Sequence, residues 1–228
     1  MHAKVGAWTE TGRRAKNDDY LSVDLNHRVI AIADGIGGAP FGDVISRIAV
    51  NESVKSFTEH GGLTKDAFEV AFEAAHDKSI SAIHSIGADA ENSGSTLLMV
   101  AWNEDGLIRA ANAGDSALLE ISDEGAILLT KPDRIPGTKN ILSKGIGNRL
   151  AWSPTQYEFL CCGHKLLVAC TDGVWGLLDD DFTHERTSCF NRLIAEAETI
   201  PIAALKLARW CAKIGGDNAS AIVLEMGE

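Results

Sequence analysis

The chain has 228 residues, of which 45% are hydrophobic and 23% are charged, a balance typical of a folded globular protein with a sizeable core. Its 21 basic and 32 acidic residues give a formal net charge of −11, which argues against a nucleic-acid partner because acidic surfaces repel a phosphate backbone. The five cysteines are odd in number and lack C-x-x-C spacing, so neither a disulfide framework nor a zinc site is expected.

Targeting and domain signals are sparse. No apolar run approaches the roughly 20 residues that a membrane-spanning helix needs, and the first ten residues, MHAKVGAWTE, lack the apolar stretch of a secretion signal. We therefore expect a cytoplasmic protein with no membrane partner. No Pro/Ser-rich linker or low-complexity run divides the chain, which predicts a single domain over residues 1–228.

Short segments rich in Val, Ile, Leu and aromatic residues, bounded by Gly, Asn and Asp, predict ten β-strands. In chain order they lie at about 3–8, 20–24, 28–33, 95–102, 107–111, 116–121, 126–130, 156–160, 166–170 and 219–225. Segments with helical spacing lie at about 42–60, 65–86, 184–198 and 201–214. Helices therefore come in pairs between groups of strands, which predicts an α+β sandwich rather than alternating βαβ units.

Acidic residues stand at the ends of predicted strands or in the loops that join them. The clusters are RRAKNDDY (13–20), IADGIGG (32–38), NAGDSALL (112–119), CTDGVWG (170–176) and GGDNASAIV (215–223). Any one of these aspartates, taken alone, is more often a turn or capping residue than a ligand. Carboxylates that converge without His or Cys, next to glycines that let carbonyl oxygens approach, suit hard cations such as Mg²⁺ or Mn²⁺. Two such cations would support phosphoester hydrolysis.

The order and wording of these clusters resemble the metal-dependent Ser/Thr protein phosphatases of the type 2C class, over essentially the whole chain. The motifs that carry the resemblance are TGRRAKNDD (11–19), ADGIGG (33–38), SGSTLLMVAW (93–102), NAGDS (112–116), TDGVW (171–175) and GGDNASAIVLEM (215–226). The resemblance implies a four-layer αββα sandwich, in which two antiparallel β-sheets are flanked by pairs of helices. It also implies hydrolysis of phosphoserine and phosphothreonine in a phosphoprotein, opposing a protein kinase, through a water or hydroxide that bridges two metal ions.

The resemblance also implies a set of metal ligands for two Mg²⁺ or Mn²⁺ ions per chain. Asp34 is the residue that bridges both metals, and the carbonyl oxygen of Gly35 is a further ligand. Asp172 and Asp217 bind the metal on one side of the bridging water. Asp19 holds the pair through its carboxylate or through bound waters.

Further roles follow from the same resemblance. Arg14 is expected to bind the substrate phosphate, since a guanidinium fork matches two phosphate oxygens, and with Asp34 it is a candidate catalytic residue. Asp18, where the family usually has Glu, and Asn218 are expected to support the metal ligands from behind. Asp115 is expected to help to hold a third, weakly bound cation.

Four departures from the family pattern bear on activity. Ile36 stands where eukaryotic members often carry a proton-donating His, which favours a bacterial-type member, and Ala117 and Gly176 replace an Arg and an acid. Only about ten residues separate residues 128–130 from 140–147, so the helical flap of the family is expected to be truncated. Two alternatives stay open: a catalytically weak or inactive relative that acts as a phosphoprotein-binding regulatory module, and a small-molecule phosphatase.

Overall fold

The computed structural model describes residues 2–36, 39–87, 92–122, 125–138, 141–147, 149–179 and 184–227, and these residues form ten strands and five helices. The strands are β1 (His2–Glu10), β2 (Asp19–Asp24), β3 (Val29–Asp34), β4 (Leu97–Trp102), β5 (Leu107–Ala113), β6 (Ala117–Ser122), β7 (Gly125–Leu128), β8 (Thr155–Leu160), β9 (Lys165–Cys170) and β10 (Ala219–Gly227). The helices are α1 (Gly42–His60), α2 (Lys65–Ile86), α3 (Asp172–Asp179), α4 (His184–Ala195) and α5 (Ile200–Gly215).

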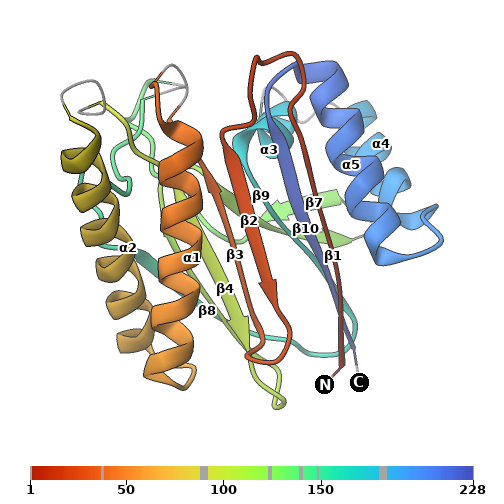
Figure 1. Cartoon of the computed structure of the whole chain (residues 1–228). Coiled ribbons are helices and arrows are strands. Elements are labelled where there is room, and N and C mark those ends of the chain that lie inside the picture. The colour runs from red at the N-terminus through yellow and green to blue at the C-terminus, as the bar shows by residue number, and fades with distance from the viewer. Residues whose placement is uncertain are drawn as a thin grey trace.

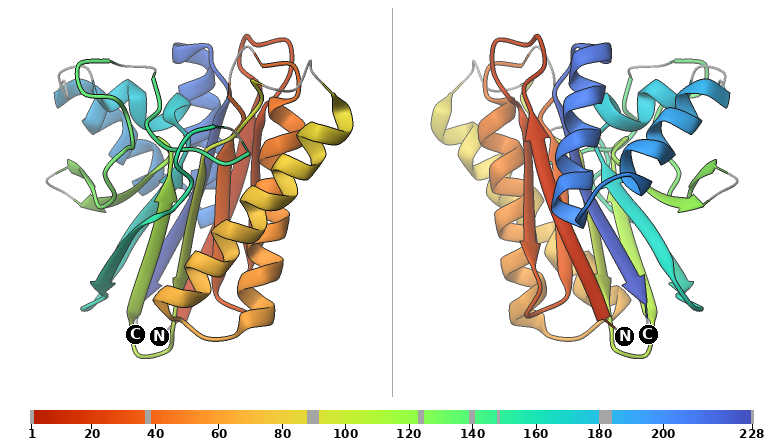
Figure 2. Two further views of the ribbon diagram at one scale, coloured as in Figure 1. Left: turned by 90° about the vertical axis from the view of Figure 1, so that its left-hand side faces the viewer. Right: turned by 90° about the vertical axis from the view of Figure 1, so that its right-hand side faces the viewer.

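The strands form two five-stranded antiparallel sheets, with the orders β1-β10-β9-β6-β7 and β2-β3-β4-β5-β8. Figures 1 and 2 show the sheets packed between α1 and α2 on one side and α3, α4 and α5 on the other. The chain is therefore the predicted four-layer αββα sandwich. Both termini lie at the end of the sandwich opposite the β1–β2 loop (Figure 1).

Burial on both faces explains why the strands read as continuous apolar runs. In β3, Val29 and Ala31 pack under α1 and α2, whereas Ile30 and Ile32 pack between the two sheets. Successive strand residues point to opposite faces, so a strand covered on both sides needs apolar residues at every position. This arrangement holds the strand ends, where polar residues gather, in a fixed register.

The predicted bounds of α1 and α2 agree with the structure. Gly61 follows α1 with φ +73°, a conformation that glycine adopts without strain, and its N–H donates to the carbonyl of Phe57. Thr64 caps α2 by accepting a hydrogen bond from the Ala67 N–H at 3.1 Å. The two helices therefore form the αα-hairpin that the sequence predicts over one sheet face.

The second helical layer differs from the prediction. The sequence predicts no helix over the segment that begins at Asp172, but this segment forms α3, so three helices of the described chain cover this face instead of two. Val174, Trp175 and Leu178 are at most 3% exposed and pack into the core beneath α5. Burial of these three side chains outweighs the low helix propensity of Gly173 and Gly176.

The segment between β7 and β8 spans residues 129–154. Its described residues, 129–138, 141–147 and 149–154, contain no helix and no named strand and are joined by isolated bridges such as Arg134 to Leu142. Elsewhere, all five cysteines are free thiols. None of the described helices is long and apolar enough to cross a membrane.

Candidate active site

Five aspartates meet at one end of the sandwich. This end carries the β1–β2 loop and lies opposite the two termini in Figure 1. Asp19 begins β2, Asp34 ends β3, Asp115 lies between β5 and β6, Asp172 begins α3 and Asp217 lies between α5 and β10. Antiparallel neighbours bring a strand start beside a strand end, so acids far apart in the sequence become neighbours. A cleft of about 410 Å³ opens here, lined by Arg14, Asp18, Asp34, Gly35, Ile36, Thr96, Asp115, Leu142, Asp172, Asp217 and Asn218.

Asp19 and Asp34 are directly opposite each other in the β2–β3 register. Like charges in this position repel, so the pair is unfavourable unless a proton or a cation intervenes. Asp19 is only 7% exposed, and its Oδ2 accepts hydrogen bonds from Ser220 Oγ at 2.6 Å and Thr171 Oγ1 at 2.9 Å. Its Oδ1 is buried with no hydrogen-bond partner among the residues that the structure describes.

The backbone around Asp34 is held by hydrogen bonds on both sides. Its carbonyl accepts from the Thr96 N–H at 2.8 Å, and its own N–H donates to Thr96 Oγ1 at 2.8 Å. Gly35 lies so close to α1 that a Cβ at this position would be 2.3 Å from the carbonyl carbon and oxygen of Gly42. Only glycine fits there, which explains the Asp-Gly pair without a hairpin turn. Gly37 and Gly38 of the same motif lie outside the described residues.

Burial and crowding raise the pKa values of these carboxyl groups. Desolvation raises the pKa of Asp19 to about 7, against its hydrogen bonds to Ser220 and Thr171. Desolvation, and then the charge of Asp115, raise the pKa of Asp172 to about 6. The pKa of Asp34 is raised well above its ordinary range, first by desolvation and then by the charge of Asp19. The ionised forms of these carboxyl groups therefore repel one another in a buried site, and a bound cation would offset this repulsion.

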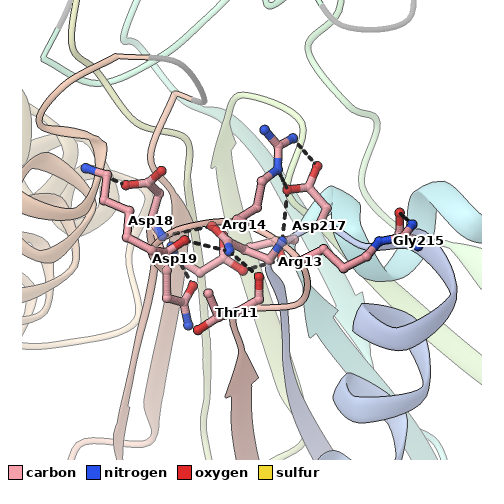
Figure 3. Close-up of polar contacts among 11 residues, drawn as sticks. Thr11, Arg13, Arg14, Asp18, Asp19, Gly215 and Asp217 are labelled. Carbon is pink, nitrogen blue, oxygen red and sulfur yellow. Dashed lines mark hydrogen bonds and ion pairs between the residues drawn. The ribbon is translucent and has the colours of Figure 1, made fainter.

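Arg14 faces Asp217 across the mouth of the cleft. Its Nε and Nη2 donate to the two Asp217 oxygens at 2.7 Å each, a bidentate pair that Figure 3 shows. The adjacent Arg13 extends away from the cleft, and its Nη2 donates to the Gly215 carbonyl (Figure 3). Of the two arginines, Arg14 is thus the one at the cleft, where the resemblance implies a phosphate-binding residue.

Asn218 ties the β1–β2 loop to β10. Its Nδ2 donates to the carbonyls of Thr11 and Lys16, and its Oδ1 accepts from the Asp18 N–H at 2.8 Å. The Asp18 carboxylate lies 2.9 Å from Lys16 Nζ, and its carbonyl accepts from the Gly35 N–H at 3.0 Å. Both residues therefore hold the loop that carries Arg14 and Asp19 against the end of the sheets.

Arg134 also reaches this cluster, which the sequence did not predict. Its Nε donates to Asp115 Oδ2 at 2.9 Å, and its Nη2 donates to Asp172 Oδ2 at 3.4 Å. The residue belongs to the segment between β7 and β8, for which the sequence predicts only a shortened flap. Its sequence context, KPDRIPG (131–137), gives no signal of a contact with the acidic motifs.

The atoms that the cluster offers are of the kind that hard divalent cations bind, but the side chains are not arranged around a common point. All the candidate ligand atoms are oxygens, and Asp19 Oδ1 is a buried oxygen with no hydrogen-bond partner among the described residues. Within the described ranges, no three His, Cys, Asp or Glu side chains stand in a ready-made metal-binding arrangement. In this arrangement Arg14 pairs with Asp217, and Arg134 pairs with Asp115 and Asp172. Coordination by Asp217 and Asp172 therefore requires an exchange of these partners.

A family model described as protein phosphatase 2C matches residues 10–210. The chain belongs to the protein phosphatase 2C family. Among solved structures, the serine/threonine phosphatase PstP/Ppp of Mycobacterium tuberculosis has a TM-score of 0.81 at 20% identity, over 99% of each chain. The phosphatase MsPP of Mycobacterium smegmatis, solved with cacodylate, has a TM-score of 0.78 at 22% identity, over 98% of each chain. The catalytic domain of PstP with two manganese ions has a TM-score of 0.81 at 19% identity, over 99% of each chain.

No curated protein sequence matches the chain significantly. Family membership confirms the resemblance on which the sequence interpretation depends, and it makes the chain a metal-dependent Ser/Thr protein phosphatase by class. The first two of these solved relatives are bacterial, in agreement with the expected bacterial type.

The phosphatase brings together every residue that the sequence singled out. Eight of them line the cleft: Arg14, Asp18, Asp34, Gly35, Asp115, Asp172, Asp217 and Asn218. Asp19 is buried next to them and accepts hydrogen bonds from Thr171 and Ser220. Ile36, the apolar residue that takes the place of a proton-donating His, also lines the cleft. The roles assigned to these residues remain proposals.

Proposed function

We propose that this phosphatase hydrolyses phosphoserine and phosphothreonine in proteins with two divalent cations, Mg²⁺ or Mn²⁺. Asp19, Asp34, Asp172, Asp217 and the carbonyl of Gly35 would hold them. The observation that carries the proposal is the direct pairing of Asp19 with Asp34 in a buried register, beside a cleft lined by further acids. Such a pair is poorly stabilised by protein groups alone and is well suited to a shared cation. The two manganese ions of the PstP catalytic domain support the count.

Bound divalent cations would supply Lewis acidity, which activates water and stabilises the negative charge that develops during phosphoryl transfer. The chain itself provides orientation. Arg14 binds the substrate phosphate: its guanidinium lines the cleft, and its side chain is 53% exposed, so a phosphate can replace the Asp217 carboxylate as its partner.

Leaving-group protonation has no dedicated side chain at position 36, because Ile36 has no ionisable proton to donate. The reaction therefore depends on protons delivered by solvent in the open cleft. This separates the phosphatase from relatives in which a histidine follows the Asp-Gly motif.

The biological setting follows from this activity. The substrate is a phosphorylated protein, and the partner system is the Ser/Thr kinase that phosphorylates it. We propose that both act in the cytoplasm.

The test is hydrolysis of an aryl phosphate and of a phosphopeptide in Mn²⁺, in Mg²⁺ and in excess chelator. Wild type should turn over both substrates only with a divalent cation, and Asp34→Asn should lose essentially all activity. Asp24→Asn is the matched control, since Asp24 ends β2 far from the cleft and pairs with His27. A wild type without metal-stimulated turnover would exclude an enzyme and favour the phosphoprotein-binding module. Turnover of free phosphoamino acids but not of the phosphopeptide would favour a small-molecule phosphatase.

A further inference from the structure

The guanidinium group of Arg134 lies between two acids of the active site. It donates to Asp115 at 2.9 Å and to Asp172 at 3.4 Å, and its side chain is 15% exposed, between 7% for Asp115 and 32% for Asp172. Arginine stays charged at every accessible pH. The cluster therefore contains a permanent positive charge that belongs to the chain itself.

The backbone next to Arg134 is fixed to the strand end that carries Asp115. The Asp133 N–H donates to the Gly114 carbonyl at 2.8 Å, and Asp133 Oδ2 accepts from the Gly114 N–H at 3.3 Å. The Ser143 N–H donates to the Asp133 carbonyl at 2.8 Å, which closes the segment on itself. Arg134 is thus held in place by its backbone and does not depend on the conformation of a free loop.

Trp175, on α3, contacts both Arg134 and Asp115. The Arg134 guanidinium lies 4.6 Å from the centroid of the Trp175 ring, a distance at which the ring face attracts a cation. The Trp175 Nε1 donates to the Asp115 carbonyl at 2.7 Å. Because Trp175 is also 3% exposed, the guanidinium is enclosed by two carboxylates and a buried aromatic ring.

We infer that Arg134 is a resident cation of the active site, which holds Asp115 and Asp172 together in the position of a third divalent cation. The phosphatase then binds two metal ions and not three. This inference rests on the proposed two-cation function, and it replaces the expectation that Asp115 holds a weak third cation. A divalent cation at Asp115 would have to displace the Arg134 guanidinium from its shorter contact, at 2.9 Å, in a buried site, which weakens such binding on the order of 100-fold.

Arg134 acts here as a positioning residue. By binding Asp115 it removes one carboxylate from the metal set, and by its weaker contact with Asp172 it orients that side chain without occupying both oxygens. The longer distance to Asp172 indicates that Asp172 is the partner released more readily. Asp115 therefore serves to hold Arg134, and Asp172 remains available as a metal ligand.

The experiment counts the Mn²⁺ ions bound to the full chain by equilibrium dialysis and locates them by anomalous diffraction from crystals grown in Mn²⁺. We expect two ions in the wild type and three in Arg134→Ala, with the additional ion at Asp115. The double variant Arg134→Ala/Asp115→Asn should return to two. Arg109→Ala is the matched control, because Arg109 is similarly buried, at 18% exposure, but pairs with Glu158 on β8.

Each other outcome is informative. Three ions in the wild type, or two in a folded Arg134→Ala variant, would overturn the inference while leaving the two-cation function intact. A wild type that binds no Mn²⁺ would instead overturn the proposed function. Should Arg134→Ala fail to fold, Arg134→Gln removes the charge while it keeps a hydrogen-bonding side chain, and the same counts apply to it.

Discussion

Asp19 should destabilise the metal-free protein, and Asp19→Asn should therefore raise its stability. An asparagine oxygen can accept the same hydrogen bonds from Ser220 and Thr171, while its amide group can donate toward Asp34. The substitution removes the buried charge and its repulsion from Asp34 with almost no change in volume. The protein should gain stability at the same position where it loses a metal ligand.

The size of the effect follows from the pKa of Asp19. Burial raises this pKa from 3.8 to about 7 in the folded chain. At about 1.4 kcal/mol per pKa unit, keeping Asp19 ionised above pH 7 costs up to about 4 kcal/mol of folding free energy. Part of this is lost in burying an amide, so we expect a gain of roughly 2–4 kcal/mol, or roughly 5–15 °C in Tm for a domain of this size.

The sign of the pH dependence can be tested in the same experiment. The folded pKa of Asp19 lies above its unfolded value, so the native state binds more protons between about pH 4 and pH 7 and its stability falls as pH rises through this range. Urea unfolding in excess chelator at pH 5 and pH 8 should show this loss in the wild type. Asp19→Asn should be less dependent on pH.

The control is Asp24→Asn, at the other end of the same strand. Hydrogen bonds from His27 lower the pKa of Asp24, so this carboxylate stabilises the fold and its loss should reduce stability slightly. In Mn²⁺ the order should reverse, with the wild type gaining stability and Asp19→Asn gaining little. Equal or lower stability of Asp19→Asn in chelator at pH 8 would refute the reasoning.

Two further predictions concern the cleft and its support. Arg14→Ala should raise KM for a phosphopeptide roughly 10- to 100-fold, because the substitution removes charge-assisted contacts with the substrate phosphate. A Mn²⁺ titration of this variant should show undiminished metal affinity. Arg13→Ala is the control and should have little effect, because Arg13 lies outside the cleft. Matching losses in metal affinity would show that Arg14 acts through Asp217. His76 accepts a hydrogen bond from the Gly147 N–H at 3.3 Å, and burial lowers its pKa against the opposing charge of Asp77. The pKa of His76 is lower in the folded than in the unfolded chain, so the contribution of neutral His76 to folding stability is lost as pH falls below about 6.5. Between pH 7 and pH 5 in Mn²⁺, the melting temperature of His76→Gln should therefore fall less than that of the wild type. Parallel curves for the two proteins would contradict this.

Much of this molecule can be predicted from the sequence, because the informative patterns are local. All ten strands and the bounds of α1 and α2 follow from runs of apolar residues and from the glycines and caps that end them. Asp19, Asp34 and Asp172 each stand beside a strand end, so their convergence can be expected once the strands are ordered. The phosphate-binding role of Arg14 is implied by the family resemblance alone, and the structure places Arg14 at the cleft.

The tertiary structure alone decided α3 and Arg134. A stretch that begins Asp-Gly has weak helix propensity, and it becomes helical because Val174, Trp175 and Leu178 find a buried surface beneath α5. Arg134 is 19 residues from Asp115, with no periodic relation between them. Their contact exists because Asp133 bonds to Gly114 across the sheet end, and because a buried carboxylate is stabilised by whichever cation the fold brings within reach.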